Sequence, residues 1–280
     1  SEFELMSDTE VDLRMTASTK KASVLTKLLT PGAKHLKVAF IYEKTSASSA
    51  WTYSHELGRL HLNEVFPDDV TTVYYDSINS HNIEEAIDDA IANGCNVIFT
   101  TSPTFSQASL KAAIANPKIT ILNCSLHDPH TSMRTYYARM HEAKFIMGAV
   151  AGSMAAHDKI VYIADYPIYG TIANINSFAQ GVKMTNPRAK IHLLWSCLKD
   201  VDVEEQIKQL QPDCVSDKDL SVPEAGTRYY GLYMSYPDSI WNLAIPIYNW
   251  GKFYEQLIEA ILNGTWKADD SKNVKAINYW

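Results

Sequence analysis

Short apolar runs alternate with stretches of helical spacing along most of this chain, and this alternation limits the fold more than any other feature of the sequence. The apolar runs have the length and the β-branched content of buried strands. The first series comprises runs at Lys37–Tyr42, Val70–Tyr75, Asn96–Thr101 and Ile119–Asn123, separated by helical stretches at Ala50–Phe66, Ile83–Ala92 and Ser106–Ala115. Such a series predicts βαβ units around a parallel sheet.

A second series of the same kind follows. It comprises an extended segment at Arg134–Ala138, helices at His141–Ala156, Thr171–Met184 and Val203–Leu210, strands at Lys159–Ala164 and Lys190–Ser196, short strands at Asp213–Val215 and Tyr229–Tyr233, and a final helix at Gly251–Leu262. Two consecutive series predict an α/β protein with two doubly wound parallel-sheet lobes. Ligands of such sheets bind outside the carboxyl ends of the strands, so the loops after the strands form the candidate site.

Three of these loops carry hydroxyl and aromatic side chains. Glu43–Ala50 is rich in Ser and Thr and leads directly into a helix, where Trp51 can stack on a planar base. Thr101–Ser106 repeats this composition, and Asp165–Gly170 contributes two tyrosines and an acid. For each loop, a capped turn with a packed aromatic is the alternative interpretation. We favour a binding site because three such loops occur at the expected strand ends.

The motifs that would indicate catalysis are missing from the sequence. It contains no GxSxG elbow, P-loop, HExxH or GxGxxG pattern. The densest histidine cluster is His127, Asp128 and His130, and no further histidine or carboxylate completes a metal site there. A polar crossover loop is the favoured interpretation over a metal or catalytic site. We therefore expect no enzyme, no metal and no cofactor.

Charge and apolar content exclude two further classes of protein. The formal net charge is −7 and basic residues do not cluster, which argues against a nucleic-acid partner. The longest apolar stretch, Phe145–Ala156, is much shorter than the roughly 20 residues that cross a bilayer. Gly148 and Gly152 within it have small-xxx-small spacing, which we interpret as a soluble helix lying close on a sheet rather than a membrane dimer face.

The N-terminus and the cysteines bear on the compartment without deciding it. Residues 1–36 are interpreted as a tag remnant and linker, with Met6 as a candidate native start. If Met6 is the native start, the protein is cytoplasmic; if an upstream signal was removed, it is tethered to the membrane outside the cytoplasm. The four cysteines, Cys95, Cys124, Cys197 and Cys214, allow two disulfides by count, but unpaired thiols are favoured.

Several stretches resemble one known family. They are KVAFIYEKTSASSAWTYSHELGR, NVIFTTSPTFSQASLKAA, MRTYYARMHEAKFIMGAVAG, KIVYIADYPIYGTIANINSFAQGVKMTNPRAK and YNWGKFYEQLIEAILNGTWK. The resemblance as a whole runs from Lys37 to Trp280. In them the chain is similar to the basic membrane protein (BMP) or PnrA-like nucleoside-binding receptors of bacterial ABC transporters. The resemblance implies a type I periplasmic-binding-protein-like fold with a hinge, three chain crossovers and a central cleft. It implies one lobe from residues 37–130 and 248–280, and a second from residues 131–247.

The resemblance also implies a purine nucleoside in the cleft and a set of ligand-binding residues. Trp51 matches the aromatic that stacks on the base, and Ser102 and Phe105 match the second cleft loop. Tyr169 and Asn174 lie where the third loop meets its helix, and Trp250 lies in the crossover back to the first lobe.

The chain departs from the family pattern at four places. Gln107 stands where the family often has Asp, and Leu198 or Lys199 stands where a second stacking aromatic is expected. No carboxylate occurs in Gly231–Tyr236, where the family grips the ribose, and the family's lysine is replaced around Trp250. We therefore hypothesise a bare nucleobase as a ligand at least as good as its nucleoside.

Three functions follow from these observations. The first is the solute-binding component of a BMP-type ABC uptake system, with an ABC permease as partner. The second is a cytosolic ligand sensor, fused to or paired with a regulatory domain, because fold and cleft do not fix the pathway. The third is a nucleoside hydrolase, which would need a carboxylate cluster or a metal site at the cleft.

Overall fold

The computed structural model describes residues 35–126, 130–165, 169–220, 226–236, 239–266 and 278–279. The chain divides into two units, Ser1–His35 and Leu36–Trp280. The first unit lies outside the described residues except for His35, so the interpretation of residues 1–36 as tag and linker stays a prediction.

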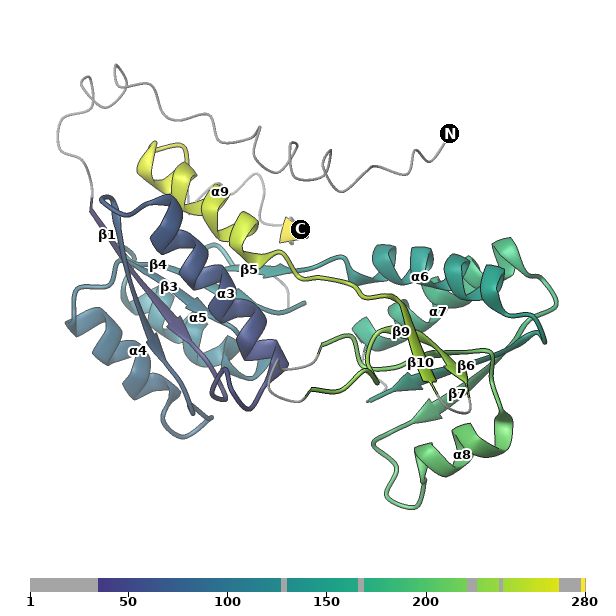
Figure 1. Ribbon diagram of the computed structural model, residues 1–280. Helices are drawn as coiled ribbons and strands as arrows, with labels where there is room; N and C mark the ends of the chain where they lie inside the picture. The colour runs from purple at the N-terminus through teal and green to yellow at the C-terminus, as the bar shows by residue number, and fades with distance from the viewer. Residues whose placement is uncertain are drawn as a thin grey trace. The chain divides into compact units, whose positions relative to one another are not determined.

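The first sheet is fully parallel and has the strand order β11-β5-β4-β3-β1-β2 (Figure 1). Its strands are β1 (Leu36–Ile41), β2 (Val70–Tyr75), β3 (Val97–Thr100), β4 (Thr120–Cys124), β5 (Arg134–Tyr137) and β11 (Asn278–Tyr279). The helices of this lobe are α3 (Ala50–Val65), α4 (Ile83–Ala92), the 3-10 turn η1 (Pro103–Phe105), α5 (Ser106–Ala115) and α9 (Trp250–Leu262).

Alternate residues of β1 enter two different cores, as a strand buried on both faces requires. Val38 and Phe40 pack with residues of α3 and α9. Ala39 and Ile41 pack with residues of α4 and α5 on the opposite face. The first lobe is therefore doubly wound, as the sequence predicts.

The second sheet is mixed and has the order β10-β9-β8-β6-β7. The strands β6 (Lys159–Ala164), β7 (Lys190–Trp195) and β8 (Cys214–Ser216) are parallel, whereas β9 (Leu232–Tyr236) and β10 (Ser239–Ala244) are antiparallel. The short link between β9 and β10 allows only an antiparallel pair. The expected all-parallel sheet is thus extended at one edge by a hairpin.

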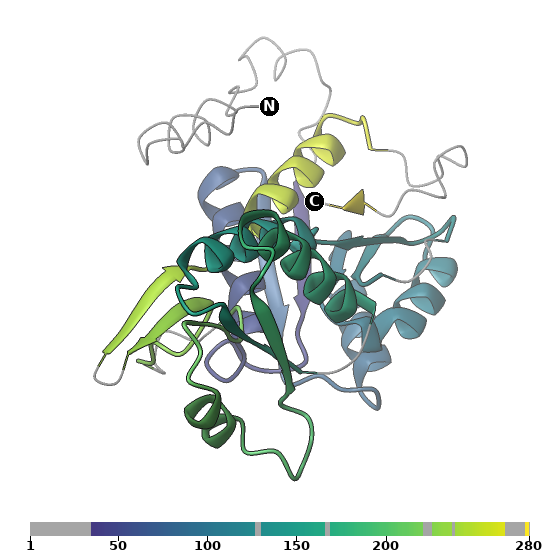
Figure 2. The same ribbon diagram turned by 90° about the vertical axis from the view of Figure 1, so that its right-hand side faces the viewer.

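Helices cover both faces of the second sheet (Figures 1 and 2). The helices α6 (Met140–Met154) and α7 (Tyr169–Thr185) pack on one face, in a core that contains Met147 and Phe178. On the other face lies α8 (Val203–Leu210), whose Ile207 packs against a core that contains Val215. No helix in the described part of the chain is long and apolar enough to cross a membrane.

The glycines of α6 allow it to approach another helix closely. A Cβ on Gly148 would lie 2.0 Å from the backbone oxygen of Phe178 in α7, and one on Gly152 would lie 2.8 Å from that of Val182. The small-xxx-small spacing therefore serves a close helix–helix contact within the second lobe. The close partner of α6 is α7 rather than a sheet.

The chain passes between the lobes twice within the described residues. The first crossing follows β5, which pairs with β4 in the first sheet, so the expected lobe boundary at residue 130 moves to beyond Tyr137. The second crossing is 245–249, between β10 and α9. The remaining limits of the two lobes along the sequence stay a prediction.

Candidate functional site

Trp51 lies in the first turn of α3, at the carboxyl-terminal edge of the first sheet. Ser49 caps this helix by accepting a hydrogen bond from the amide of Thr52. The indole Nε1 of Trp51 donates to the carbonyl oxygen of Thr101, 2.8 Å away, just after β3. This bond holds the start of α3 against the second predicted loop.

Four aromatic rings, which we call the crossover cluster, gather at the two crossings: Trp51, Tyr137, Tyr248 and Trp250. The Trp51 ring lies 6.1 Å from Tyr137 and 5.4 Å from Tyr248, measured between ring centroids. Tyr248 and Trp250 stack with centroids 5.3 Å apart and an interplanar angle of 9°. The crossover cluster thus joins α3 to both segments through which the chain changes lobe.

A buried polar chain lies beneath the crossover cluster. The ring of His55 stacks on Trp250 at 4.5 Å, and its Nδ1 lies 2.6 Å from the Tyr254 hydroxyl. That hydroxyl lies 2.9 Å from the hydroxyl of Tyr136. Burial lowers the pKa of His55 to about 3, so its imidazole is neutral at neutral pH. His55 Nε2 is buried and has no hydrogen-bond partner among the described residues.

Two of the six predicted site residues are buried in the core and do not face a cavity. Phe105 is 0% exposed, because the turn η1 directs its ring into the core between β1, β3 and α5. Trp250 is 1% exposed, and its Nε1 donates to the hydroxyl of Ser54 at 3.2 Å. In this structure both side chains pack in the core, and their direct contact with a ligand stays a prediction.

The other predicted loop residues have different environments. Ser102 caps η1 by accepting from the amide of Thr104 at 3.2 Å, and its carbonyl accepts from Asn123 Nδ2 at 2.8 Å. Tyr169 begins α7, but its side chain lies outside the described residues. Asn174 is half-buried on α7. Their contact with a ligand stays a prediction.

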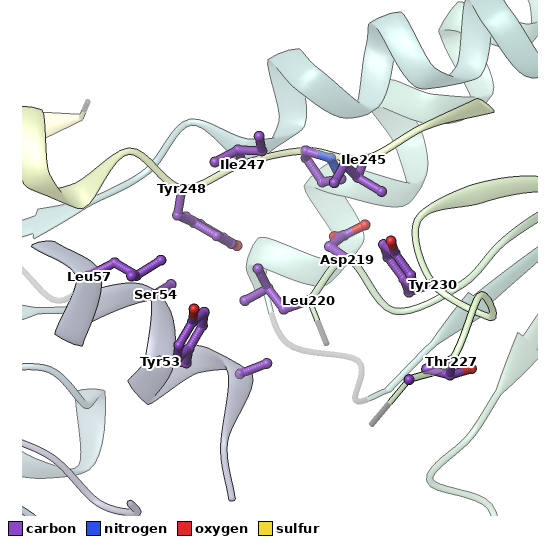
Figure 3. Close-up of a pocket in the computed structure, with 13 residues that line it drawn as sticks. Tyr53, Ser54, Leu57, Asp219, Leu220, Thr227, Tyr230, Ile245, Ile247 and Tyr248 are labelled. Atoms are coloured by element: carbon purple, nitrogen blue, oxygen red, sulfur yellow. The ribbon is translucent and has the colours of Figure 1, made fainter. Parts of the chain in front are cut away.

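A cavity of about 300 Å³ lies beside the crossover cluster, between residues of both lobes (Figure 3). Its walls come from the outer side of α3, from the segment after β8 and from the second crossing. The described residues that line it are Ala50, Tyr53, Ser54, Leu57, Asp219, Leu220, Gly226, Thr227, Tyr230, Ile245, Pro246, Ile247 and Tyr248. None of the six predicted site residues is among them, although Ala50 and Ser54 flank Trp51 along α3.

The cavity contains a carboxylate that the sequence analysis missed. Asp219 follows β8 and forms an ion pair through Oδ1 with Nζ of Lys144 on α6. Lys144 is 2% exposed, and its Nζ also lies 5.3 Å from the ring centroid of Tyr162. Burial raises the pKa of Asp219, and Lys144 partly offsets that rise. The pattern Asp217-Lys-Asp219 directly after a strand was the available signal.

A second aspartate on this segment is occupied by the protein itself. Asp217 Oδ1 accepts from the amide of Lys218 at 2.7 Å, and Oδ2 accepts from the Tyr233 hydroxyl at 3.3 Å. Burial raises the pKa of Asp217 as well. Asp217 is not among the described residues that line the cavity.

The histidine cluster lies only partly within the structure. His127 and Asp128 are outside the described residues, and His130 Nδ1 accepts from the amide of Ser132 at 3.1 Å. Within the described ranges, no group of three His, Cys, Asp or Glu side chains is placed to hold a metal ion. All four cysteines are free thiols, three of them buried.

Comparison with known proteins places the chain in a family. The family described as "ABC transporter substrate-binding protein PnrA-like" matches residues 35–207. This chain belongs to that family. The resemblance inferred from the sequence is thereby confirmed, and the chain is a binding protein rather than an enzyme, which argues against the hydrolase alternative.

Individual relatives are distant. A purine-binding protein of Brucella abortus is 26% identical over 259 residues, which cover 85% of this chain and 73% of the relative. A putative ABC transporter glucose-binding protein of Haloferax volcanii is 22% identical over 248 residues, which cover 84% of this chain but only 63% of the relative.

A solved structure supports the fold. A solute-binding protein of an ABC transporter system from Conexibacter woesei superposes with a TM-score of 0.65 at 15% identity, and the match covers 83% of each chain. This PnrA-like chain therefore has the two-lobed fold of periplasmic binding proteins, as predicted.

Proposed function

We propose that this PnrA-like chain binds a purine nucleobase or nucleoside between its lobes, as the solute-binding component of an ABC uptake system. One observation carries the proposal: the cavity that residues of both lobes line also has three tyrosines in its walls, Tyr53, Tyr230 and Tyr248. Tyrosine rings can stack on a planar heterocycle while their hydroxyls form hydrogen bonds. The name of the Brucella relative, a purine-binding protein, supports the same class of ligand.

Asp219 bears on the hypothesis that a nucleobase binds at least as tightly as its nucleoside, and the hypothesis is kept. The hypothesis assumed that no carboxylate could grip the ribose, and Asp219 lies in the cavity wall. However, Oδ1 of Asp219 is engaged by Lys144. Among the described residues only Oδ2 lacks a protein partner, so two neighbouring ribose hydroxyls would have to share it or compete with Lys144 for Oδ1.

Binding would couple the two lobes. A ligand that contacts α3 on one side and the segment after β8 on the other favours the arrangement in which both contacts form together. The permease of the uptake system would then distinguish the occupied protein from the empty one.

The direct test is calorimetry with adenine, adenosine, guanosine and glucose, preceded by native mass spectrometry to identify any retained small molecule. We expect the purified protein to bind adenine at least as tightly as adenosine, and glucose not at all. Binding of glucose alone would overturn the purine assignment, and a strong preference for adenosine over adenine would overturn the base preference.

Measuring ligand uptake by cells distinguishes a transport receptor from a ligand sensor. A ligand sensor with the same cavity would bind the same molecule. We expect cells that lack the gene to lose high-affinity uptake of the radiolabelled ligand. Unchanged uptake, together with altered transcription on addition of the ligand, would favour the sensor and its regulatory partner.

A further inference from the structure

Lys144 is a buried cation that forms an ion pair with one carboxylate in the described part of the chain. Its side chain projects from α6 into the second lobe, and Asp219 is the acid that it contacts. An unpaired charge in such a site would be strongly destabilising. The ion pair therefore holds Asp219 in place and makes the local charge of the pair zero.

The second oxygen of Asp219 is differently placed. The side chain is 19% exposed and lies in the wall of the cavity (Figure 3). Oδ1 is engaged by Lys144, whereas Oδ2 has no protein partner in the described part of the chain. An ionised carboxylate oxygen is only an acceptor, so it requires a donor from whatever fills the cavity.

We propose that Asp219 is a specificity-determining residue, whose Oδ2 accepts a hydrogen bond from an N–H group of a neutral purine base, while Lys144 acts as a positioning residue through Oδ1. This inference rests on the proposed function and names the group by which the cavity recognises its ligand. The tyrosine hydroxyls in the cavity can donate or accept, so they discriminate less between ligands. Because Lys144 already neutralises Asp219, the ligand needs no positive charge.

The proposal makes Asp219→Asn a sharp test. Asn retains a carbonyl oxygen for Lys144, but its amide group then presents a donor to the cavity where the ligand also presents a donor. A hydrogen bond to a charged group contributes enough that its loss weakens binding on the order of 10- to 100-fold. We expect calorimetry to show a loss of this size in the affinity of Asp219→Asn for adenine.

Methylated analogues identify the donor. In 6-methylpurine a methyl group replaces the amino group of adenine, and in 9-methyladenine the ring N–H is blocked. We expect one of the two to bind the wild-type protein more weakly than adenine does and to lose nothing further in Asp219→Asn. Equal losses for all three ligands would overturn the proposal, as would a loss confined to adenosine, which would assign Asp219 to the ribose.

Two further variants separate recognition from folding. Lys144→Met with Asp219→Asn removes the buried charge together with the carboxylate, so the double variant should fold even if Asp219→Asn does not, and its affinity for adenine should stay low. Asp217→Asn is the matched control on the same segment, because its carboxylate bonds to Tyr233 and Lys218. We expect its affinity to stay within about twofold of wild type.

The pH profile of Lys144→Met tests the positioning role. Without its cation, the buried carboxyl favours the protonated form, which no longer accepts on both oxygens. We expect the adenine affinity of this variant to fall more steeply with decreasing pH than that of the wild type, in which Lys144 favours the ionised carboxylate. If calorimetry shows that the wild-type protein binds no purine, the proposed function itself is contradicted. If the wild type binds purine and Asp219→Asn binds it with unaltered affinity, only the role of Asp219 is contradicted.

Discussion

Trp51 is held in place by a hydrogen bond from its indole N–H and by aromatic contacts of its ring. The hydrogen bond from Nε1 to Thr101 ties the indole to the end of β3, and its ring packs at the edges of Tyr248 and Trp250. Tyr248 in turn lines the cavity. At the residue scale, Trp51 therefore supports the cavity wall in addition to any stacking on the ligand.

We expect Trp51→Ala to weaken purine binding by about 1–3 kcal/mol, the range for the loss of one base-stacking aromatic. The measurement is calorimetry on a variant shown to be folded by circular dichroism. Trp51→Phe is the matched variant, because it keeps an aromatic ring and loses only the bond to Thr101, so its loss should be smaller. An unchanged dissociation constant in Trp51→Ala would remove Trp51 from the site.

His55 makes stability depend on pH. Its pKa is about 3 in the folded protein, below the ordinary value of 6.5, because burial disfavours the imidazolium. Below pH 6.5 the unfolded chain binds a proton that the folded chain does not, so the free energy of unfolding falls as pH decreases from 6.5 towards 3. The slope from this group approaches about 1.4 kcal/mol per pH unit.

Urea denaturation at several pH values measures this slope. His55→Phe keeps a ring against Trp250 and removes the titrating group, so it should be less sensitive to acid than the wild type. An identical slope in the two proteins would show that other groups control acid unfolding.

At the scale of elements, the close contact between α6 and α7 depends on glycines, which have no side chain. Gly148 and Gly181 each approach the backbone of the other helix so closely that an added Cβ would lie 2.0 Å from a carbonyl oxygen. The helices must separate to accommodate a methyl group there. This contact also sets the position of Lys144, which precedes Gly148 by one turn of α6.

We expect Gly148→Ala to lower the free energy of unfolding by about 1–3 kcal/mol or more, as overpacking of a close contact does. Gly170→Ala is the matched control, because among the described residues its Cβ would meet only a side-chain carbon of Leu126 at 3.7 Å, and Ala favours a helix. Chemical denaturation should show the control to be neutral or stabilised. Equal effects of the two substitutions would mean that the close contact is not what the glycine provides.

Most of the elements follow closely from local sequence, but the edge strands β10 and β11 do not. Most predicted helices and strands agree with the structure to within a few residues, because apolar spacing and strand length are local properties. The hairpin strand β10 was not predicted, and β9 lies slightly later than expected. Most of β10 is exposed or half-buried, so an edge strand of this kind leaves little hydrophobic pattern in its sequence.

At the scale of the whole molecule, the cavity joins segments that are far apart in the chain. Its lining residues run from Ala50 in the first lobe to Asp219 in the second and Tyr248 in the crossing between them. A ligand that contacts all three segments binds only the folded protein, so its binding free energy adds to the stability of the whole chain.

We expect adenine at 100 times its dissociation constant to stabilise the protein by about 2.7 kcal/mol. Thermal unfolding at increasing ligand concentrations measures this effect, which should be smaller in Asp219→Asn at the same concentrations. A midpoint that does not move with adenine, while calorimetry shows binding, would indicate equal binding to the unfolded chain and a site outside the cavity.

The sequence by itself determined the strand–helix order, the two lobes and the family, because each depends on patterns within short windows. It also placed Trp51 at the start of a helix that follows a strand. Only the tertiary structure decided which side chains face the cavity. It buried Phe105 and Trp250, which the sequence had placed in the site, and it brought Lys144 against Asp219 across 75 positions of the chain. Such contacts depend on sheet order and on where the chain crosses between lobes, and no local pattern records either.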